Sequence, residues 1–345
     1  MKKQLVCALA ACVCMAAFAA GCGEQKGEGG DNAPDPVYSV FAPDGAPALG
    51  LANGIAQTTA DFEYHVVASN LIQAQVTGAS PAADFCVLPV NLASKLLGTG
   101  ETYKMLGTVT HGNIFLLTTG ENETVTAQNV ASLKGKTVGV VQLANVPGLT
   151  FQAALSGLGV AYQTIANLEA EKAADKVNLL QMGTDASNVT PAYGCDYYLC
   201  PEPAVTAKIK GTANTPKPFR LAGSLQEIYG GEEGYPQAVL VAKSSILQNN
   251  KAVADKLISY FAGNAEYLAN ASAATVLGLL DGVRADGLTP AFTDKNFNET
   301  VIANCSVRFV PSRDCKAEVN TFLEKLAGVK ADSVSAVADA FYYLG

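Results

Sequence analysis

Short apolar runs alternate with helix-length segments along most of the chain. In the first half, the pattern predicts strands at residues 38–42, 63–68, 84–88, 103–109 and 113–118, and helices at residues 48–58, 70–76 and 91–97. A polar stretch at residues 121–129 interrupts the series, which then restarts with strands at 136–141, 161–165 and 195–200 and helices at 148–158 and 178–182. Strands that alternate with helices favour parallel sheets covered on both faces, and two such series predict two lobes.

The last hundred residues have a different pattern. Residues 235–241 form a β-like apolar run that can return the chain to the first lobe, and from about residue 245 the pattern becomes helical. Alanine-rich stretches at 251–271 and 333–343 repeat their apolar positions at spacings of three and four. We therefore expect an α/β fold with two lobes, mostly parallel sheets flanked by helices, and a helical C-terminal region that packs on the first lobe or braces the hinge.

The N-terminus has the pattern of an export signal. Lys2 and Lys3 precede an apolar run at residues 4–18, and small residues lead into Cys22 (AAGC, residues 19–22). The run is too short for a lasting membrane helix, so residues 1–21 are predicted to be a lipoprotein signal peptide that is removed. Acyl chains on Cys22 then anchor the protein to the outer face of the cytoplasmic membrane. The alternative is a plain secretory signal in which Cys22 is incidental.

Domain boundaries follow from these patterns. Residues 22–36 contain Gly, Pro and charged residues but no large apolar side chain, so they are expected to form a flexible tether. About 310 residues remain, enough for two domains of ordinary size. We expect residues 37–118 to form the first part of lobe 1, residues 119–220 to form lobe 2, and residues 221–345 to return to lobe 1 and supply the C-terminal helices.

Charge and cysteine content narrow the class of protein. The net charge of −8 makes nucleic acid an improbable partner. The protein is expected to be a monomer. In an exported chain, disulfides between Cys195 and Cys200 and between Cys305 and Cys315 would leave Cys86 as a buried thiol. The alternative is that all five are reduced core residues. No metal site and no cofactor are expected, because the chain has two histidines and no CxxC spacing.

Candidate binding residues come from the loops that follow the expected strands. In α/β sheets, ligands bind at the carboxyl ends of strands, where loops and helix N-termini present free N–H groups. These ends contain Asp44, Gly45, Ala46, Ser69, Asn70, Pro89, Asn91, Thr110, His111, Gln142, Asn145, Gly148, Thr150 and Glu202.

Each candidate also has a purely structural explanation. Asp44 and Gly45 favour tight turns, and Asn91 can cap its helix. His111 can be a satisfied loop residue, and Glu202 an exposed charge at a helix start. Gln142, Asn145 and Thr150 can be solvated loop residues.

Four of these segments carry a family resemblance. They are residues 41–49 (FAPDGAPAL), 84–91 (DFCVLPVN), 133–140 with 147–150 (LKGKTVGV, PGLT) and 200–204 (CPEPA). With this order of motifs the chain resembles the substrate-binding lipoproteins of ABC importers, in the nitrate/taurine/sulfonate and thiamine-pyrimidine-precursor branch with the type II periplasmic-binding fold. The resemblance implies a two-lobed receptor that closes on a small solute and delivers it to a membrane permease and its ATPase.

The charge of the candidate loops suggests the kind of ligand. They contain Asp44 and Glu202 but no Lys or Arg, and the chain has four arginines, at 220, 284, 308 and 313. Two carboxylates would repel an anion by roughly 1–4 kcal/mol each at about 4 Å, so an amine-bearing ring compound fits better. We expect thiamine or an aminopyrimidine, with a sulfonate, taurine or nitrate held at helix N-termini as the alternative.

Two other function classes stay open. The chain has none of the G-x-S-x-G, H-E-x-x-H or phosphate-binding-loop motifs, so we expect that it is not an enzyme. A related fold performs pyrimidine synthesis with its own histidine, which keeps His111 as the basis of an enzymatic alternative. The third possibility is a sensory ligand-binding protein that reports to a membrane kinase.

Overall fold

The computed structural model describes residues 36–345 except 122–123, 184–185 and 231–233. The signal peptide at 1–21, the lipidation site Cys22 and nearly all of the tether lie outside the described residues. Predictions about those segments therefore stay predictions.

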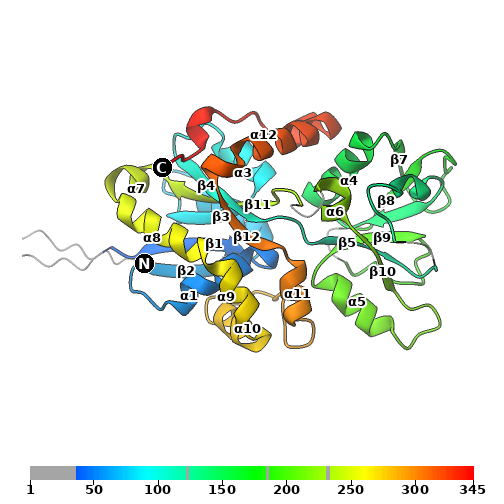
Figure 1. Ribbon diagram of the computed structural model, residues 1–345, viewed down its shortest axis with the longest axis horizontal. Helices are drawn as coiled ribbons and strands as arrows, with labels where there is room; N and C mark the ends of the chain where they lie inside the picture. The colour runs from blue at the N-terminus through cyan, green and yellow to red at the C-terminus, as the bar shows by residue number, and fades with distance from the viewer. Residues whose placement is uncertain (1–35, 122–123, 184–185, 231–233) are drawn as a thin grey trace, which may run out of the picture. The chain divides into compact units, whose positions relative to one another are not determined.

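The first sheet carries both halves of the chain. Within the described residues it has six strands, in the spatial order β12 (Val307–Pro311), β4 (Tyr103–Thr110), β11 (Ala238–Lys243), β3 (Phe85–Pro89), β1 (Tyr38–Pro43) and β2 (Phe62–Val67) (Figure 1). Strand β1 runs parallel to β2 and β3, whereas β11 is antiparallel to β3 and β4, and β12 is antiparallel to β4. The late strands β11 and β12 thus complete a sheet begun by the N-terminal strands.

Helices cover the two faces of this sheet. The core on one face includes side chains from α2 (Ile72–Val76), α3 (Val90–Leu97) and α12 (Ser312–Val329). The core on the other face includes side chains from η1 (Ala46–Leu51), α1 (Ala52–Ala56), α7 (Ser244–Asn249), α8 (Lys251–Ala262), α9 (Asn264–Asn270), α10 (Ala273–Asp281) and α11 (Glu299–Asn304). Short 3-10 turns are η2 (Ser69–Leu71), η5 (Ala331–Ser333) and η6 (Asp339–Phe341).

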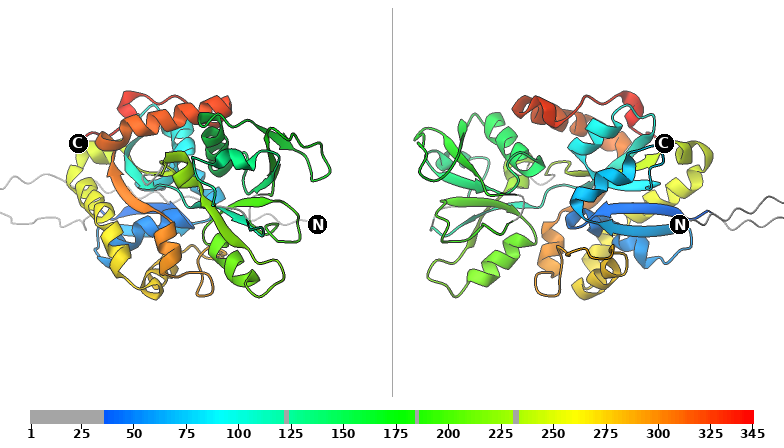
Figure 2. Two further views of the ribbon diagram at one scale, coloured as in Figure 1. Left: turned by 45° about the vertical axis from the view of Figure 1, so that its right-hand side comes forward. Right: turned by 180° about the vertical axis from the view of Figure 1, so that it is seen from behind.

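The second sheet is built from the middle of the chain. Its described strands lie in the order β10 (Arg220–Ser224), β5 (Ile114–Thr118), β9 (Tyr197–Pro201), β6 (Thr137–Val140), β8 (Val177–Gln181) and β7 (Tyr162–Ile165). Strands β6 to β9 are mutually parallel where they pair, and β5 is antiparallel to β9 and β10. Its flanking helices are η3 (Val130–Leu133), α4 (Val146–Gly157), α5 (Ala204–Thr212) and α6 (Leu225–Gly230) (Figure 2).

The expected α/β class with two helix-flanked sheets is confirmed, with one correction of detail. Both sheets are mixed, because antiparallel pairings are as frequent as parallel ones among the described strands. Each antiparallel pairing involves one of four strands. Strands β5 and β11 follow the passages between the sheets, and β12 and β10 lie at the sheet edges. Periodicity cannot show which sheet such a strand joins.

Two short segments carry the described chain between the sheets. Residues 111–113 lead from β4 to β5, and residues 234–237 lead back to β11; we call these segments the crossings. They are bonded to each other, since Tyr235 N donates to the carbonyl of His111 at 3.3 Å and Gln237 Nε2 donates to Asn113 Oδ1 at 3.0 Å. The boundaries expected at residues 118 and 220 are therefore displaced, because β5 and β10 both belong to the second sheet.

Two expected elements have a different structure. Residues 178–182, expected to be helical, lie mainly in β8, which is paired on both sides and buried, so its apolar run has no strand-like alternation. The expected helix at 333–343 is mostly irregular. Instead the backbone N–H of Tyr343 donates to Met105 O at 2.9 Å, so the end of the chain lies against β4.

Among the residues that the structure describes, no helix combines the length and apolar character needed to cross a bilayer.

Candidate functional site

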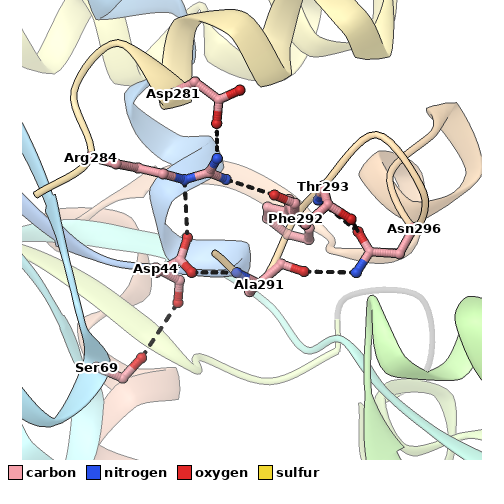
Figure 3. A network of polar contacts seen from close by, with 8 residues as sticks. All are labelled: Asp44, Ser69, Asp281, Arg284, Ala291, Phe292, Thr293 and Asn296. Atoms are coloured by element: carbon pink, nitrogen blue, oxygen red, sulfur yellow. Dashed lines mark hydrogen bonds and ion pairs between the residues drawn. The ribbon is translucent and has the colours of Figure 1, made fainter. Parts of the chain in front are cut away.

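Asp44 lies directly after β1, where the sequence placed a ligand contact. Its Oδ2 accepts a hydrogen bond from the backbone N–H of Ala291 at 2.6 Å, and its Oδ1 lies 3.8 Å from Nε of Arg284 (Figure 3). Arg284 also pairs with Asp281 and donates from Nη2 to the carbonyl of Phe292 at 3.0 Å. The Asp44 and Arg284 side chains are 7% and 8% exposed, so this is a nearly dry ion pair.

Arg284 comes from a segment that we call the strap, residues 282–297. The strap extends the first sheet beside β2, because Val66 N donates to Val283 O at 2.8 Å and Ala285 N donates to Val66 O at 2.9 Å. It then passes the carboxyl end of β1, where Ala291 bonds to Asp44. Burial lowers the pKa of the Arg284 guanidinium, and Asp44 opposes that shift.

The strap corrects the charge argument made from the sequence. The loops at the strand ends contain no Lys or Arg, but Arg284 reaches Asp44 from far along the chain. Asp44 is therefore paired within the protein and does not require a cationic ligand. Together, Asp44, Arg284 and Asp281 keep one negative charge in excess.

Glu202 lies after β9 and is 3% exposed. Its Oε2 accepts from Thr206 N at 3.0 Å, at the start of α5, and its Oε1 accepts from Thr206 Oγ1 at 2.7 Å. The same Oε1 accepts from Asn304 Nδ2 at 2.7 Å, and Asn304 ends α11 on the first sheet. Glu202 thus joins the two lobes, and its described hydrogen-bond partners are all neutral groups.

Thr110 and His111 lie where the chain leaves the first sheet. The imidazole of His111 is 1% exposed, and its Nε2 shares a hydrogen bond with Thr108 Oγ1 at 2.9 Å. Burial lowers the pKa of His111 to about 3, and the positive charge of Arg308 adds to the shift. Thr110 is fully buried. His111 lies in the first crossing and Thr110 ends β4, and His111 Nδ1 and Thr110 Oγ1 are buried without a hydrogen-bond partner among the described residues.

The residues around the start of α4 divide into two groups. Asn145 is exposed at the N-cap position without a side-chain capping bond, and Gln142 is half-buried with a positive φ of 58°. Thr150 is fully buried and donates to the carbonyl of Val146 at 2.7 Å. A side chain at Gly148 would collide with the backbone of Leu143, so this glycine allows close packing of loop and helix.

The remaining candidates line the strand ends of the first sheet. Gly45 adopts a φ of 101° with open space where a Cβ would lie, and Ala46 is buried at the start of η1. Asn91 Nδ2 donates to the carbonyl of Ser333 at 3.4 Å, so it also braces the C-terminal segment. Ser69 and Asn70 are exposed in η2, and Pro89 is half-buried at the end of β3.

The cysteines follow the alternative of reduced core residues. Cys86, Cys195, Cys200, Cys305 and Cys315 are all free and buried, which corrects the expected disulfides. Cys305 and Cys315 belong to core clusters on opposite faces of the first sheet. Cys200 lies within β9 and Cys195 precedes that strand. Since an extended chain advances by roughly 3.3 Å per residue, the two cysteines are held apart along it. Burial raises the pKa of Cys195 and Cys315 to about 11 and that of Cys200 to about 12, so these thiols stay protonated.

Three residues that contribute to this region were not expected from the sequence. Arg284, Asn304 and Gln237 reach it from positions more than a hundred residues away from their partners. One signal pointed to the first of them: arginine is scarce in this acidic chain, and Arg284 precedes a stretch rich in Gly, Pro, Asp and Asn. The other two are common polar residues without a sequence signal.

A cavity of about 310 Å³ lies away from Asp44 and Glu202, between α12 and the C-terminal segment, and is lined by Asn320, Leu323, Glu324, Ala327 and residues 334–337. Within the described residues, no group of His, Cys, Asp and Glu side chains is arranged to hold a metal ion.

Comparison with known proteins places the fold. No family model matches the chain, and no curated protein matches it by sequence. Solved structures do match. An ABC transporter protein from Parabacteroides distasonis has a TM-score of 0.65 at 17% identity, covering 90% of this chain and 99% of that one.

Two sulfonate-binding proteins share the same architecture. The periplasmic aliphatic sulphonate-binding protein SsuA from Escherichia coli has a TM-score of 0.57 at 12% identity, covering 90% of this chain and 95% of that one. The alkanesulfonate-binding protein SsuA from Xanthomonas axonopodis pv. citri, bound to MOPS, has a TM-score of 0.52 at 15% identity, covering 88% and 99%. The chain thus has the two-lobed, type II periplasmic-binding-protein-like fold that the sequence motifs predicted.

Proposed function

We propose that this chain is an extracytoplasmic solute-binding protein of an ABC importer. It captures a small molecule between its two lobes and delivers it to a membrane permease and its ATPase. The observation that carries the proposal is the arrangement of two sheets joined by two short, mutually bonded crossings, with Glu202 at the end of β9 bonded to Asn304 of the first lobe. Lobes connected in this way can close on a ligand as hinged bodies.

The proposed ligand is an amine-bearing heterocycle such as thiamine or an aminopyrimidine. The support for this ligand is electrostatic, but Asp44 contributes less to it because Arg284 already pairs with Asp44. Glu202 keeps neutral partners, and the group of Asp44, Arg284 and Asp281 keeps an excess negative charge. A negative local potential favours a cationic or amine-bearing solute over an oxyanion.

A sulfonate, taurine or nitrate is the second candidate. The N-terminus of α4 has an exposed Asn145 and no side-chain capping bond, and such helix ends bind anions. Structural neighbours that bind sulfonates share the fold, which supports testing this class beside the amines.

Different observations distinguish an enzyme and a sensory protein from an importer component. The enzymatic alternative depended on His111 as a working imidazole, and that side chain is buried inside the crossing. A sensory role would be favoured by a membrane kinase encoded beside this chain, whereas an adjacent permease and ATPase would favour import. We further propose that the protein is a monomer held to the membrane by lipid on Cys22.

A thermal-shift screen of the purified mature protein tests the function. The first compounds to test are thiamine, an aminopyrimidine, taurine and nitrate. The assay detects binding because a ligand at 100 times its Kd stabilises the native state by about 2.7 kcal/mol. We expect an amine-bearing heterocycle to stabilise the protein and to reduce its radius of gyration in small-angle scattering. Tight binding of taurine or nitrate would overturn the amine preference and leave import standing. A protein that no small metabolite stabilises or contracts would refute solute binding.

A further inference from the structure

The two lobes touch on both sides of the crossings, and the two contacts differ in chemistry. One contact is apolar and lies on the face of the first sheet that carries α12. The other is polar and lies on the face that carries α11. The helices α12 and α11 contribute to separate core clusters on those opposite faces, and Figures 1 and 2 show the passage between the sheets lying between them.

The apolar contact is an aromatic group that we call the seam: Tyr229 on α6, Tyr235 in the second crossing, and Phe322 on α12. Their ring centroids lie 5.5 to 5.6 Å apart, with Tyr235 stacked on Phe322. Tyr235 and Phe322 are fully buried, and Lys325 covers the ring of Tyr229 at 4.7 Å. Separating these rings would expose a large apolar surface to water.

The seam continues into the cores of both lobes. Leu149 on α4 and Leu326 on α12 belong to one buried cluster, which contains side chains from both sheets. Because that cluster is continuous, the lobes cannot part on this side without dividing a packed core.

The polar contact contains a hydrogen bond from Asn304 Nδ2 on α11 to Glu202 Oε1 at 2.7 Å; we call this bond the clasp. Water can replace an amide donor at a carboxylate, so the clasp can open with little change in exposed apolar surface. Both oxygens of Glu202 are held at the start of α5 by Thr206, so its carboxylate keeps its orientation when Asn304 leaves.

We infer that the lobes pivot about the seam and that the Glu202–Asn304 clasp holds them together on the opposite side, so that opening moves α5 away from α11. This inference rests on the proposed solute binding for its purpose but not for its test. In this arrangement Glu202 is a positioning residue for closure, and a solute would bind more weakly where the clasp is lost.

Spin-label distances in the ligand-free mature protein test the clasp. One label pair at Lys210 and Thr300, both exposed, spans α5 and α11; a second pair at Ser156 and Glu324, also exposed, spans α4 and α12. In Asn304→Ala we expect a longer and broader distance distribution for the first pair, and no change for the second. Loss of a hydrogen bond to a charged group should lower the ratio of closed to open molecules by roughly tenfold or more.

Two further variants make the test specific. Thr206→Val removes another donor to the same Glu202 oxygen, but within one lobe. Because the backbone N–H of residue 206 still holds Oε2, this variant should leave both distances unchanged. Asn304→Asp places a second carboxylate against Glu202 and should open the first pair further than Asn304→Ala does. The inference is overturned if the first distance in both Asn304 variants matches the wild type, or if the second pair moves as much as the first. None of these distances requires a ligand, so failure to find a solute would refute the proposed function separately.

Discussion

The imidazole of His111 lies inside the first crossing, where burial lowers its pKa to about 3. In the unfolded chain a histidine titrates near its ordinary pKa of about 6.5. Between these two values the unfolded state binds a proton that the folded state does not. The folded state is therefore favoured above about pH 6.5 and loses stability as the pH falls towards 3.

Replacing His111 tests this linkage. We expect the wild type to lose up to about 1.4 kcal/mol of unfolding free energy per pH unit through this group below pH 6.5, and His111→Asn to lack that component. Urea unfolding of both proteins at pH 7, 6 and 5 measures the difference. Parallel pH dependences in the two proteins would show that His111 does not carry the effect.

At the scale of elements, loop and helix contacts decide which candidate residues face solvent. The loop before α4 packs directly on Gly148, and the strap packs on the carboxyl end of β1 through Arg284 and Ala291. Asp44 therefore has partners within the protein, and Gly148 has a packing role. Asn145 is exposed and Gln142 is half-buried.

Two glycines of the same helix give a matched test. Gly148→Ala should destabilise the protein by roughly 1–3 kcal/mol, because the new methyl group meets the backbone of Leu143. Gly157, at the other end of α4, has no atom within 4 Å of the Cβ position, so Gly157→Ala should be neutral or stabilise by up to about 1 kcal/mol. Chemical unfolding of both variants provides the comparison. Equal effects of the two substitutions would exclude a packing role for Gly148.

At the scale of the whole molecule, the protein is expected to work at a membrane without a described helix that crosses it. The order of basic residues, apolar run and AAGC at the N-terminus predicts acylation of Cys22, outside the described residues. Stable attachment needs more than one acyl chain on that cysteine.

Fractionation of expressing cells tests the anchor. The wild type should sediment with membranes and carry lipid detectable by mass spectrometry, and Cys22→Ser should be released into the soluble fraction. A serine variant that stays with the membranes, together with a wild type that carries no lipid, would contradict the lipoprotein signal.

The sequence by itself determined the α/β class and most of the strands, because apolar periodicity reflects local burial. The strands at residues 38–42, 103–109 and 113–118 were found within a residue or so of their observed ends. It failed at residues 178–182, where burial on both faces removes the alternation that distinguishes a strand from a helix.

The tertiary structure decided which residues meet. Arg284 neutralises Asp44, Asn304 binds Glu202, and Gln237 bonds to Asn113, in each case across more than a hundred residues of chain. Composition and spacing carry no information about such pairs, since the fold alone brings their backbones together. The sequence located the strand ends where a site should lie. Only the packing around those strand ends showed which of their side chains already bind partners within the protein.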